Sequence, residues 1–159
     1  REINKEVINL GFSGNGRFEK EVVQFIMPSK PSVIVLDCTP NSAPDTILKN
    51  LPETIAFIRN IDDSVPIVLV ETIIRDYAYF KENDPKIFGT LSYIQNQNNA
   101  LRKVYLDAKK NNKNTHYIFS KELIGLDNEA TVDGTHFNDL GNYRMFQFLL
   151  PIIEKLLNL

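Results

Sequence analysis

The sequence predicts a doubly wound α/β fold, in which helices cover both faces of a mostly parallel sheet. Two observations support this prediction. Short apolar runs alternate with longer amphipathic ones along the chain, and strict alternation of strands and helices is typical of right-handed βαβ units. The short runs are also continuously apolar, as in parallel strands that are covered on both sides.

Strands are expected at residues 7–10, 33–36, 67–70 and 116–119, each with an apolar run. Helices are expected at residues 17–27, 45–59, 91–110 and 138–157, where apolar residues recur at helical spacing. Asp45 is a plausible N-cap for the second helix. Residues 75–89 have no clear period and are expected to form a long loop.

The 159 residues fit a single domain that spans residues 1–159, with 43% hydrophobic and 24% charged residues. The net charge of −2 leaves no basic stripe, so a nucleic-acid partner is not expected. No apolar run reaches the roughly 18 residues that a membrane span requires. The single cysteine, Cys38, excludes an internal disulfide and a cysteine-rich zinc site.

A glycine-containing segment, residues 9–16 (NLGFSGNG), follows the first expected strand. Glycines allow a sharp turn that exposes backbone N–H groups. The segment lacks the last glycine of a dinucleotide fingerprint, where Glu19 stands, and the Gly-Lys-Ser/Thr of a P-loop. It also lacks the final glycine of a nucleophile elbow, where Asn15 stands. An oxyanion site, which needs only an unobstructed N–H, and a plain tight turn both remain open.

Two further segments carry polar side chains that fit catalysis. Asn41 follows the second expected strand. Either its side-chain amide donates to an oxyanion, or Asn41 is only a turn residue beside Pro40. Asp133 precedes His136 by three residues, so its carboxylate can accept the imidazole Nδ1–H and leave Nε2 free to take a proton. A surface turn is the alternative for this pair. The other histidine, His116, begins an apolar run and is interpreted as structural.

Together these segments resemble the SGNH (GDSL-like) hydrolases, a family of serine esterases with a flavodoxin-like fold. Asn9-x-Gly11-x-x-Gly14 resembles the second block of the family, Thr39-Pro40-Asn41-Ser42 the third, and Asp133-Gly134-Thr135-His136 the last. The resemblance implies a three-layer α/β/α sandwich, an oxyanion hole at Gly14 and Asn41, and an acid and base at Asp133 and His136.

The chain departs from the family in two places. The third block has Thr39 and Ser42 where the family has glycine and aspartate. The first block, which carries the nucleophilic serine, is absent. We therefore expect this chain to be the C-terminal portion of a longer one, whose upstream segment supplies the serine and a strand between residues 7–10 and 33–36. Ser13 and Ser42 are weaker candidates for the nucleophile.

The resemblance implies a serine ester hydrolase without metal or organic cofactor, which removes small acyl groups such as acetyl from carbohydrate esters. Arg75 and Tyr77, in the long loop, are candidates for substrate contact. A phosphate- or nucleotide-binding module and a catalytically inactive interaction domain remain as alternatives. Similarity to bacterial members of the family implies a periplasmic or secreted location, and the oligomeric state is left open.

Overall fold

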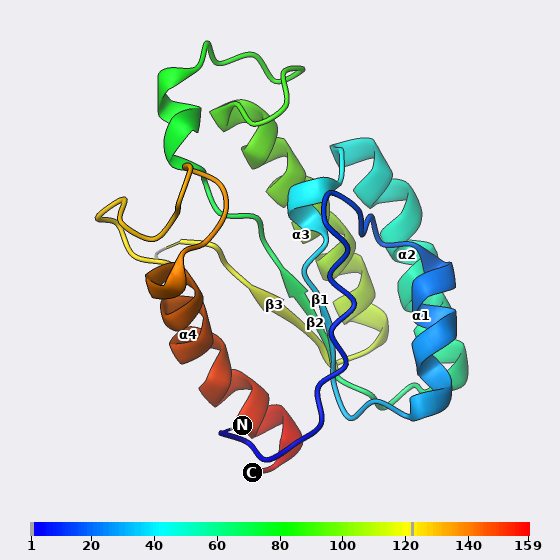
Figure 1. Cartoon of the computed structure of the whole chain (residues 1–159). Helices are drawn as coiled ribbons and strands as arrows, with labels where there is room; N and C mark the ends of the chain where they lie inside the picture. The colour runs from blue at the N-terminus through cyan, green and yellow to red at the C-terminus, as the bar shows by residue number, and fades with distance from the viewer. Residues whose placement is uncertain (1, 122) are drawn as a thin grey trace.

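The computed structural model describes residues 2–121 and 123–159, which are built around a parallel sheet (Figure 1). The strands are β1 (Ile34–Leu36), β2 (Ile67–Val70) and β3 (Thr115–Ile118), in the order β1-β2-β3. Ile34 pairs with Ile67, and Ile67 pairs with Thr115. Because the strands are parallel and in register, their carboxyl ends meet at one edge of the sheet, where such folds place their sites.

Helices cover both faces of the sheet, which confirms the predicted three-layer α/β architecture. The helices α1 (Lys20–Ile26), α2 (Pro44–Ile61) and α3 (Leu91–Asn111) lie on one face, and α4 (Asp139–Leu157) lies on the other (Figure 1). Within the described residues, no helix combines the length and apolar character needed to cross a bilayer.

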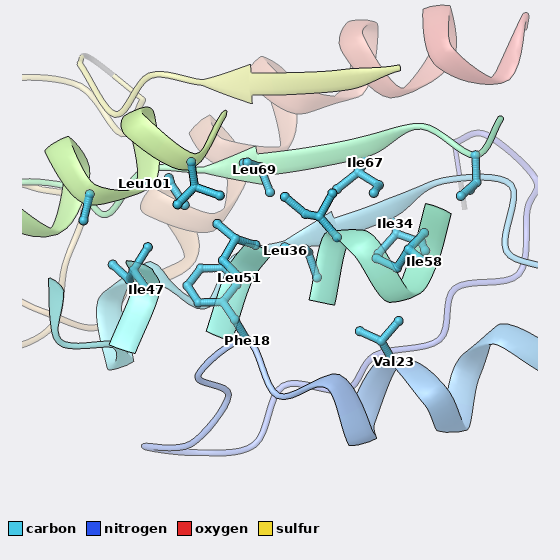
Figure 2. Packing of buried hydrophobic residues seen from close by; sticks show 14 of the residues in the cluster. Phe18, Val23, Ile34, Leu36, Ile47, Leu51, Ile58, Ile67, Leu69 and Leu101 are labelled. Atoms are coloured by element: carbon cyan, nitrogen blue, oxygen red, sulfur yellow. The ribbon is translucent and has the colours of Figure 1, made fainter. Parts of the chain in front are cut away.

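The central strand β2 is buried on both faces. Its alternate residues Ile67 and Leu69 join the apolar cluster under α1, α2 and α3, part of which is shown in Figure 2. Val68 and Val70 face the opposite way and pack in a second cluster with residues of α4. This alternation explains why the run 67–70 is continuously apolar.

The expectation of a strand at residues 7–10 is wrong for the described chain. These residues form no β-ladder, and Val7 and Ile8 are exposed to solvent. A strand needs a neighbour that accepts and donates its backbone hydrogen bonds, and this segment forms no ladder with any described strand. The segment is also not paired with β1, which pairs only with β2 among the described strands.

Smaller differences concern the ends of elements. α1 begins at Lys20 and not at Arg17, because Phe18 has a φ of 60°, which is incompatible with a right-handed helix. The N-cap of α2 is Ala43, so the prediction of Asp45 as N-cap is wrong, and Asp45 lies in the first turn. The expected loop 75–89 contains a short 3-10 helix, Asp76–Phe80.

The segment before α1 is anchored to α2 by a buried hydrogen bond. The hydroxyl of Thr54 donates to the carbonyl of Phe18 at 2.7 Å, and both side chains are buried. Asn50, one helical turn earlier, donates to the carbonyl of Arg17 at 2.9 Å. These bonds fix the point where the glycine-containing segment returns to the body of the protein.

We expect Thr54→Val to lower the free energy of unfolding by about 1–3 kcal/mol, because it leaves the buried Phe18 carbonyl without its donor. Thr46→Val on the same helix is the matched control, since the Thr46 side chain forms no hydrogen bond with the described residues, and a change within about 0.5 kcal/mol is expected. Chemical denaturation of both variants measures the difference. Equal stabilities would show that the Thr54 bond does not anchor the segment.

Candidate active site

A cavity of about 420 Å³ lies at the carboxyl edge of the sheet. It brings together four residues that the sequence singled out at widely separated positions: Gly14, Asn41, Arg75 and His136. The remaining lining residues are Gly11, Phe12, Ser13, Asp37, Pro40, Glu71, Thr72, Ile73, Leu123, Thr135, Phe137 and Met145.

Gly14 lies at the tip of a tight turn on the wall of the cavity. The Asn15 N–H donates to the Phe12 carbonyl at 2.9 Å, and Gly14 has a φ of 67°. This positive φ, at the third position of the turn, is the reason for a glycine here. The Gly14 N–H has no acceptor among the described residues. It is therefore free to donate to a ligand oxygen in the cavity.

Asn41 lies in a short 3-10 helix, Thr39–Asn41, directly after β1. Its Nδ2 donates to the Asn15 carbonyl at 2.8 Å, which ties the Asn41 side chain to the turn that carries Gly14. This bond uses one of the two amide hydrogens. The second hydrogen is left for a ligand, so Gly14 and Asn41 form a candidate pair of oxyanion donors.

The backbone around Asn41 is held by buried polar side chains from other elements. The Thr39 hydroxyl donates to the Val70 carbonyl at 2.7 Å. Gln97 of α3, which is 1% exposed, donates from Nε2 to the carbonyls of Thr39 and Ser42 at 2.9 and 2.7 Å. The 3-10 helix is therefore bonded on both sides of Asn41.

Asp133 and His136 form the expected pair. Nδ1 of His136 lies 2.7 Å from Oδ2 of Asp133, and the backbone N–H groups of Thr135 and His136 donate to Oδ1. The bonds from His136, backbone first, lower the pKa of Asp133 to about 2, so the carboxylate stays ionised at neutral pH. The His136 side chain is 77% exposed, and this leaves Nε2 open to a reacting group.

A small hairpin presents this pair at the cavity. Thr131 and Phe137 form an antiparallel bridge, and the Val132 N–H donates to the His136 carbonyl at 2.8 Å. Gly134, with a φ of 79°, forms the tip, and its N–H donates to the Thr131 hydroxyl at 3.1 Å. The pair thus lies within a hairpin that is closed by backbone hydrogen bonds.

Tyr77 lies behind the cavity wall and does not line the cavity. A Cβ on Gly134 would lie 3.4 Å from the Tyr77 ring, and one on Gly89 would collide with the Tyr77 hydroxyl. The hydroxyl accepts a hydrogen bond from Arg75 at 2.8 Å. Tyr77 therefore contacts Arg75, which lines the cavity, and the hairpin of His136.

Sequence reasoning missed three residues of this region. Asp37 lines the cavity and is open to solvent, but the surrounding protein removes part of its hydration and raises its pKa to about 6. Glu71 lines the cavity and accepts hydrogen bonds from Tyr117 and Ser120. Gln97 had a detectable signal, since it is a polar residue at an apolar position of the α3 pattern.

The two weaker serine candidates lie in different environments. Ser13 lines the cavity beside Gly14, although no hydrogen bond joins it to His136 among the described residues. Ser42 is fully buried, and its hydroxyl donates to the Cys38 carbonyl at 2.8 Å, so it does not reach the cavity. Burial raises the pKa of the Cys38 thiol to about 11, which fits a packing role.

Comparison with known proteins identifies the family. The model of the GDSL-like Lipase/Acylhydrolase family matches residues 1–154. The chain belongs to this family. A protein from Bacteroides ovatus ATCC 8483, assigned as a GDSL-like lipase, has a crystal structure that matches with a TM-score of 0.81 and 37% identity. The match covers 95% of this chain and 43% of the other, so this chain spans less than half the length of that structure. No curated protein matches the chain.

Gly141 supports the hairpin of this GDSL-like hydrolase domain from behind. It lies in the first turn of α4, and a Cβ there would collide with the carbonyl oxygen of Ala130. Asn138, the N-cap of α4, accepts from the Gly141 N–H at 3.0 Å. The start of α4 and the base of the hairpin therefore touch through backbone atoms.

We expect Gly141→Ala to lower the free energy of unfolding by about 1–3 kcal/mol, because the added methyl group has no space. This reverses the gain of about 1 kcal/mol that alanine usually gives over glycine inside a helix. Asn142→Ala, at the exposed next position, is the control and is expected to be neutral or stabilising. Denaturation curves compare the two, and a Gly141→Ala protein as stable as the control would contradict the close contact.

Proposed function

We propose that this domain is the acid–base and oxyanion part of a serine ester hydrolase. The observation that carries the proposal is that His136 lines the same cavity as Gly14 and Asn41 and is bonded through Nδ1 to the Asp133 carboxylate at 2.7 Å. Acyl transfer requires a carboxylate-oriented imidazole and N–H donors for the oxyanion in one site. Membership of the acylhydrolase family supports the same chemistry.

The geometry supports the following roles. A serine hydroxyl attacks the ester carbonyl while Nε2 of His136 takes its proton, and the Asp133 carboxylate stabilises the imidazolium. The Gly14 N–H and the Asn41 amide donate to the oxyanion of the tetrahedral intermediate. The ester C–O bond then breaks, and Nε2 returns the proton to the leaving alkoxide. Water, deprotonated by His136, hydrolyses the acyl-serine by the same steps in reverse.

The serine is proposed to come from residues upstream of Arg1. Ser13 is the described serine that lines the cavity, and it is not bonded to His136. One edge of β1 has no partner among the described strands, Val35 on β1 is 43% exposed, and residues 7–10 lie unpaired. A further parallel strand on this edge would pair the open backbone groups and place its carboxyl end beside Asp37 at the cavity.

The substrate is proposed to be a carbohydrate ester with a small acyl group such as acetyl. The cavity volume of about 420 Å³ fits a ligand of the size of one sugar unit with a short acyl group. Arg75 lines the cavity, and Tyr77 supports it through the hydrogen bond at 2.8 Å.

Fluorophosphonate labelling of the complete polypeptide, with the modified peptide located by mass spectrometry, tests the proposal. We expect the label on a serine upstream of Arg1 and its loss in His136→Ala, with an unchanged circular dichroism spectrum. A label on Ser13 would retain a hydrolase but overturn the assigned nucleophile. A folded protein without any label would overturn the esterase proposal.

Asn41→Ala in the same polypeptide is expected to lower kcat by roughly 10²–10³-fold with little change in KM, because one oxyanion donor is lost. Asn96→Ala is the matched control, since Asn96 is exposed on α3 and makes no side-chain hydrogen bond among the described residues. Steady-state hydrolysis of an aryl acetate measures both variants. An equal effect of the two substitutions would remove Asn41 from the oxyanion site.

A further inference from the structure

Arg75 is a buried cation on the wall of the cavity. It is 6% exposed, and no carboxylate among the described residues lies within ion-pair distance of it. Burying a charge without a counter-charge is unfavourable. An anionic group on a ligand in the cavity would therefore stabilise this guanidinium.

None of the carboxylates nearest to Arg75 in the sequence and around the cavity forms an ion pair with it. Glu71 accepts from the Tyr117 hydroxyl at 2.6 Å and from Ser120. Asp76 accepts from the Thr131 hydroxyl at 3.3 Å. Asp133 is paired with His136 at 2.7 Å. Asp37, on the β1 side of the cavity, forms no ion pair with Arg75. None of these groups supplies the missing counter-charge.

The guanidinium is held in place but keeps donors free. Nη1 donates to the Tyr77 hydroxyl at 2.8 Å and Nη2 donates to the Pro40 carbonyl at 3.2 Å. Its Cζ lies 4.9 Å from the centre of the Phe88 ring, which covers one face. These contacts use two of the five N–H groups of an arginine. The Nε–H has no hydrogen-bond partner among the described residues.

We propose that Arg75 is a specificity-determining residue that binds a carboxylate on the substrate, so that the enzyme prefers esters with an anionic group near the scissile bond. This inference rests on the proposed esterase function and extends it to the class of substrate. A planar guanidinium with free N–H groups matches a carboxylate through two parallel hydrogen bonds. Arg75 and the candidate oxyanion donors line the same cavity of about 420 Å³, so the carboxylate and the ester lie in one small molecule.

The carboxylate belongs either to the acyl part or to the alcohol part of the ester, and two substrate pairs distinguish these cases. Monoethyl and diethyl succinate differ by a charge on the acyl side. 3-Acetoxybenzoate and its methyl ester differ by a charge on the alcohol side. Hydrolysis of each by the complete polypeptide is followed by proton NMR, and the quantity compared is the ratio of kcat/KM for the charged and neutral members of a pair.

We expect the unaltered protein to favour the charged member at least tenfold in one of the two pairs. Arg75→Gln is expected to reduce that ratio at least tenfold, and Arg75→Lys to give an intermediate ratio. Arg102→Gln is the matched control, because it removes the same charge from an exposed side chain outside the cavity, and its ratio should stay within twofold of the unaltered protein.

Two results would overturn the proposal. One is the absence of any preference for the charged ester in both pairs, a measurement on the unaltered protein that does not depend on how the variants fold. The other is an Arg75→Gln protein in which both members slow down together and the ratio is kept, because Arg75 would then only hold the Pro40 carbonyl.

A binding measurement separates this proposal from the esterase proposal. If no ester is hydrolysed, the esterase function fails, and calorimetric titration with succinate still tests the anion site. At least tenfold weaker binding of succinate to Arg75→Gln than to the unaltered protein and to Arg102→Gln supports the site. Equal binding to all three proteins, or no binding to the unaltered protein at millimolar succinate, overturns it.

Discussion

The burial of β2 on both faces is the constraint on which the rest of this structure depends. Its four residues have no exposed surface, because α2 and α3 pack on one side and α4 on the other. At roughly 25 cal/mol per Å² of buried apolar area, burial of these four side chains stabilises the fold by several kcal/mol. No other strand of the described sheet is buried along its whole length. The position of β2 in turn determines where its neighbours end, and hence where the cavity forms.

Hydrogen bonds at the carboxyl end of β2 hold the backbone segments that line the cavity. The last carbonyl of β2, at Val70, accepts from Thr39, and Thr39 also accepts from Gln97 of α3. Arg75 adds a bond to the Pro40 carbonyl from the segment after β2. Asn41 thus lies in a backbone segment that is bonded to three other parts of the chain. Donors held in this way need little reorganisation when charge develops on a substrate oxygen.

Much of the fold was predictable from the sequence, because burial on both faces leaves a continuous apolar run and amphipathic helices leave a period near 3.6. The D-x-x-H spacing was informative for a similar reason, since an Asx turn is local and brings the imidazole to Asp133 within three residues. In contrast, the run at 7–10 has the composition of a strand, but a strand exists only where a neighbour pairs with it. Whether such a neighbour is present depends on residues far away in the sequence, so the local pattern does not reveal it.

The hydrogen bonds that hold the site also join residues that are far apart in the sequence. Gln97 contacts Thr39 across 58 positions, and Thr39 contacts Val70 across 31 positions. A polar residue in an apolar helix pattern signals that some partner exists, but it does not say which one. Local motifs therefore identified the candidate site residues, and the packing of distant elements identified the groups that hold them. The lack of a counter-charge for Arg75 among the described residues likewise depends on how distant carboxylates fold, which the local sequence does not contain.

The open edge of β1 and the chemistry of the cavity are linked through Asp37. This residue directly follows β1, and partial loss of hydration already raises its pKa to about 6. A strand added beside β1 would cover this carboxylate further, and additional desolvation raises the pKa of a carboxyl group. A protonated Asp37 would remove a negative charge from the side of the cavity where the added strand ends. On the proposed function, completion of the sheet would supply the serine hydroxyl to His136 and would also make the cavity more favourable for the anionic substrate proposed to bind Arg75.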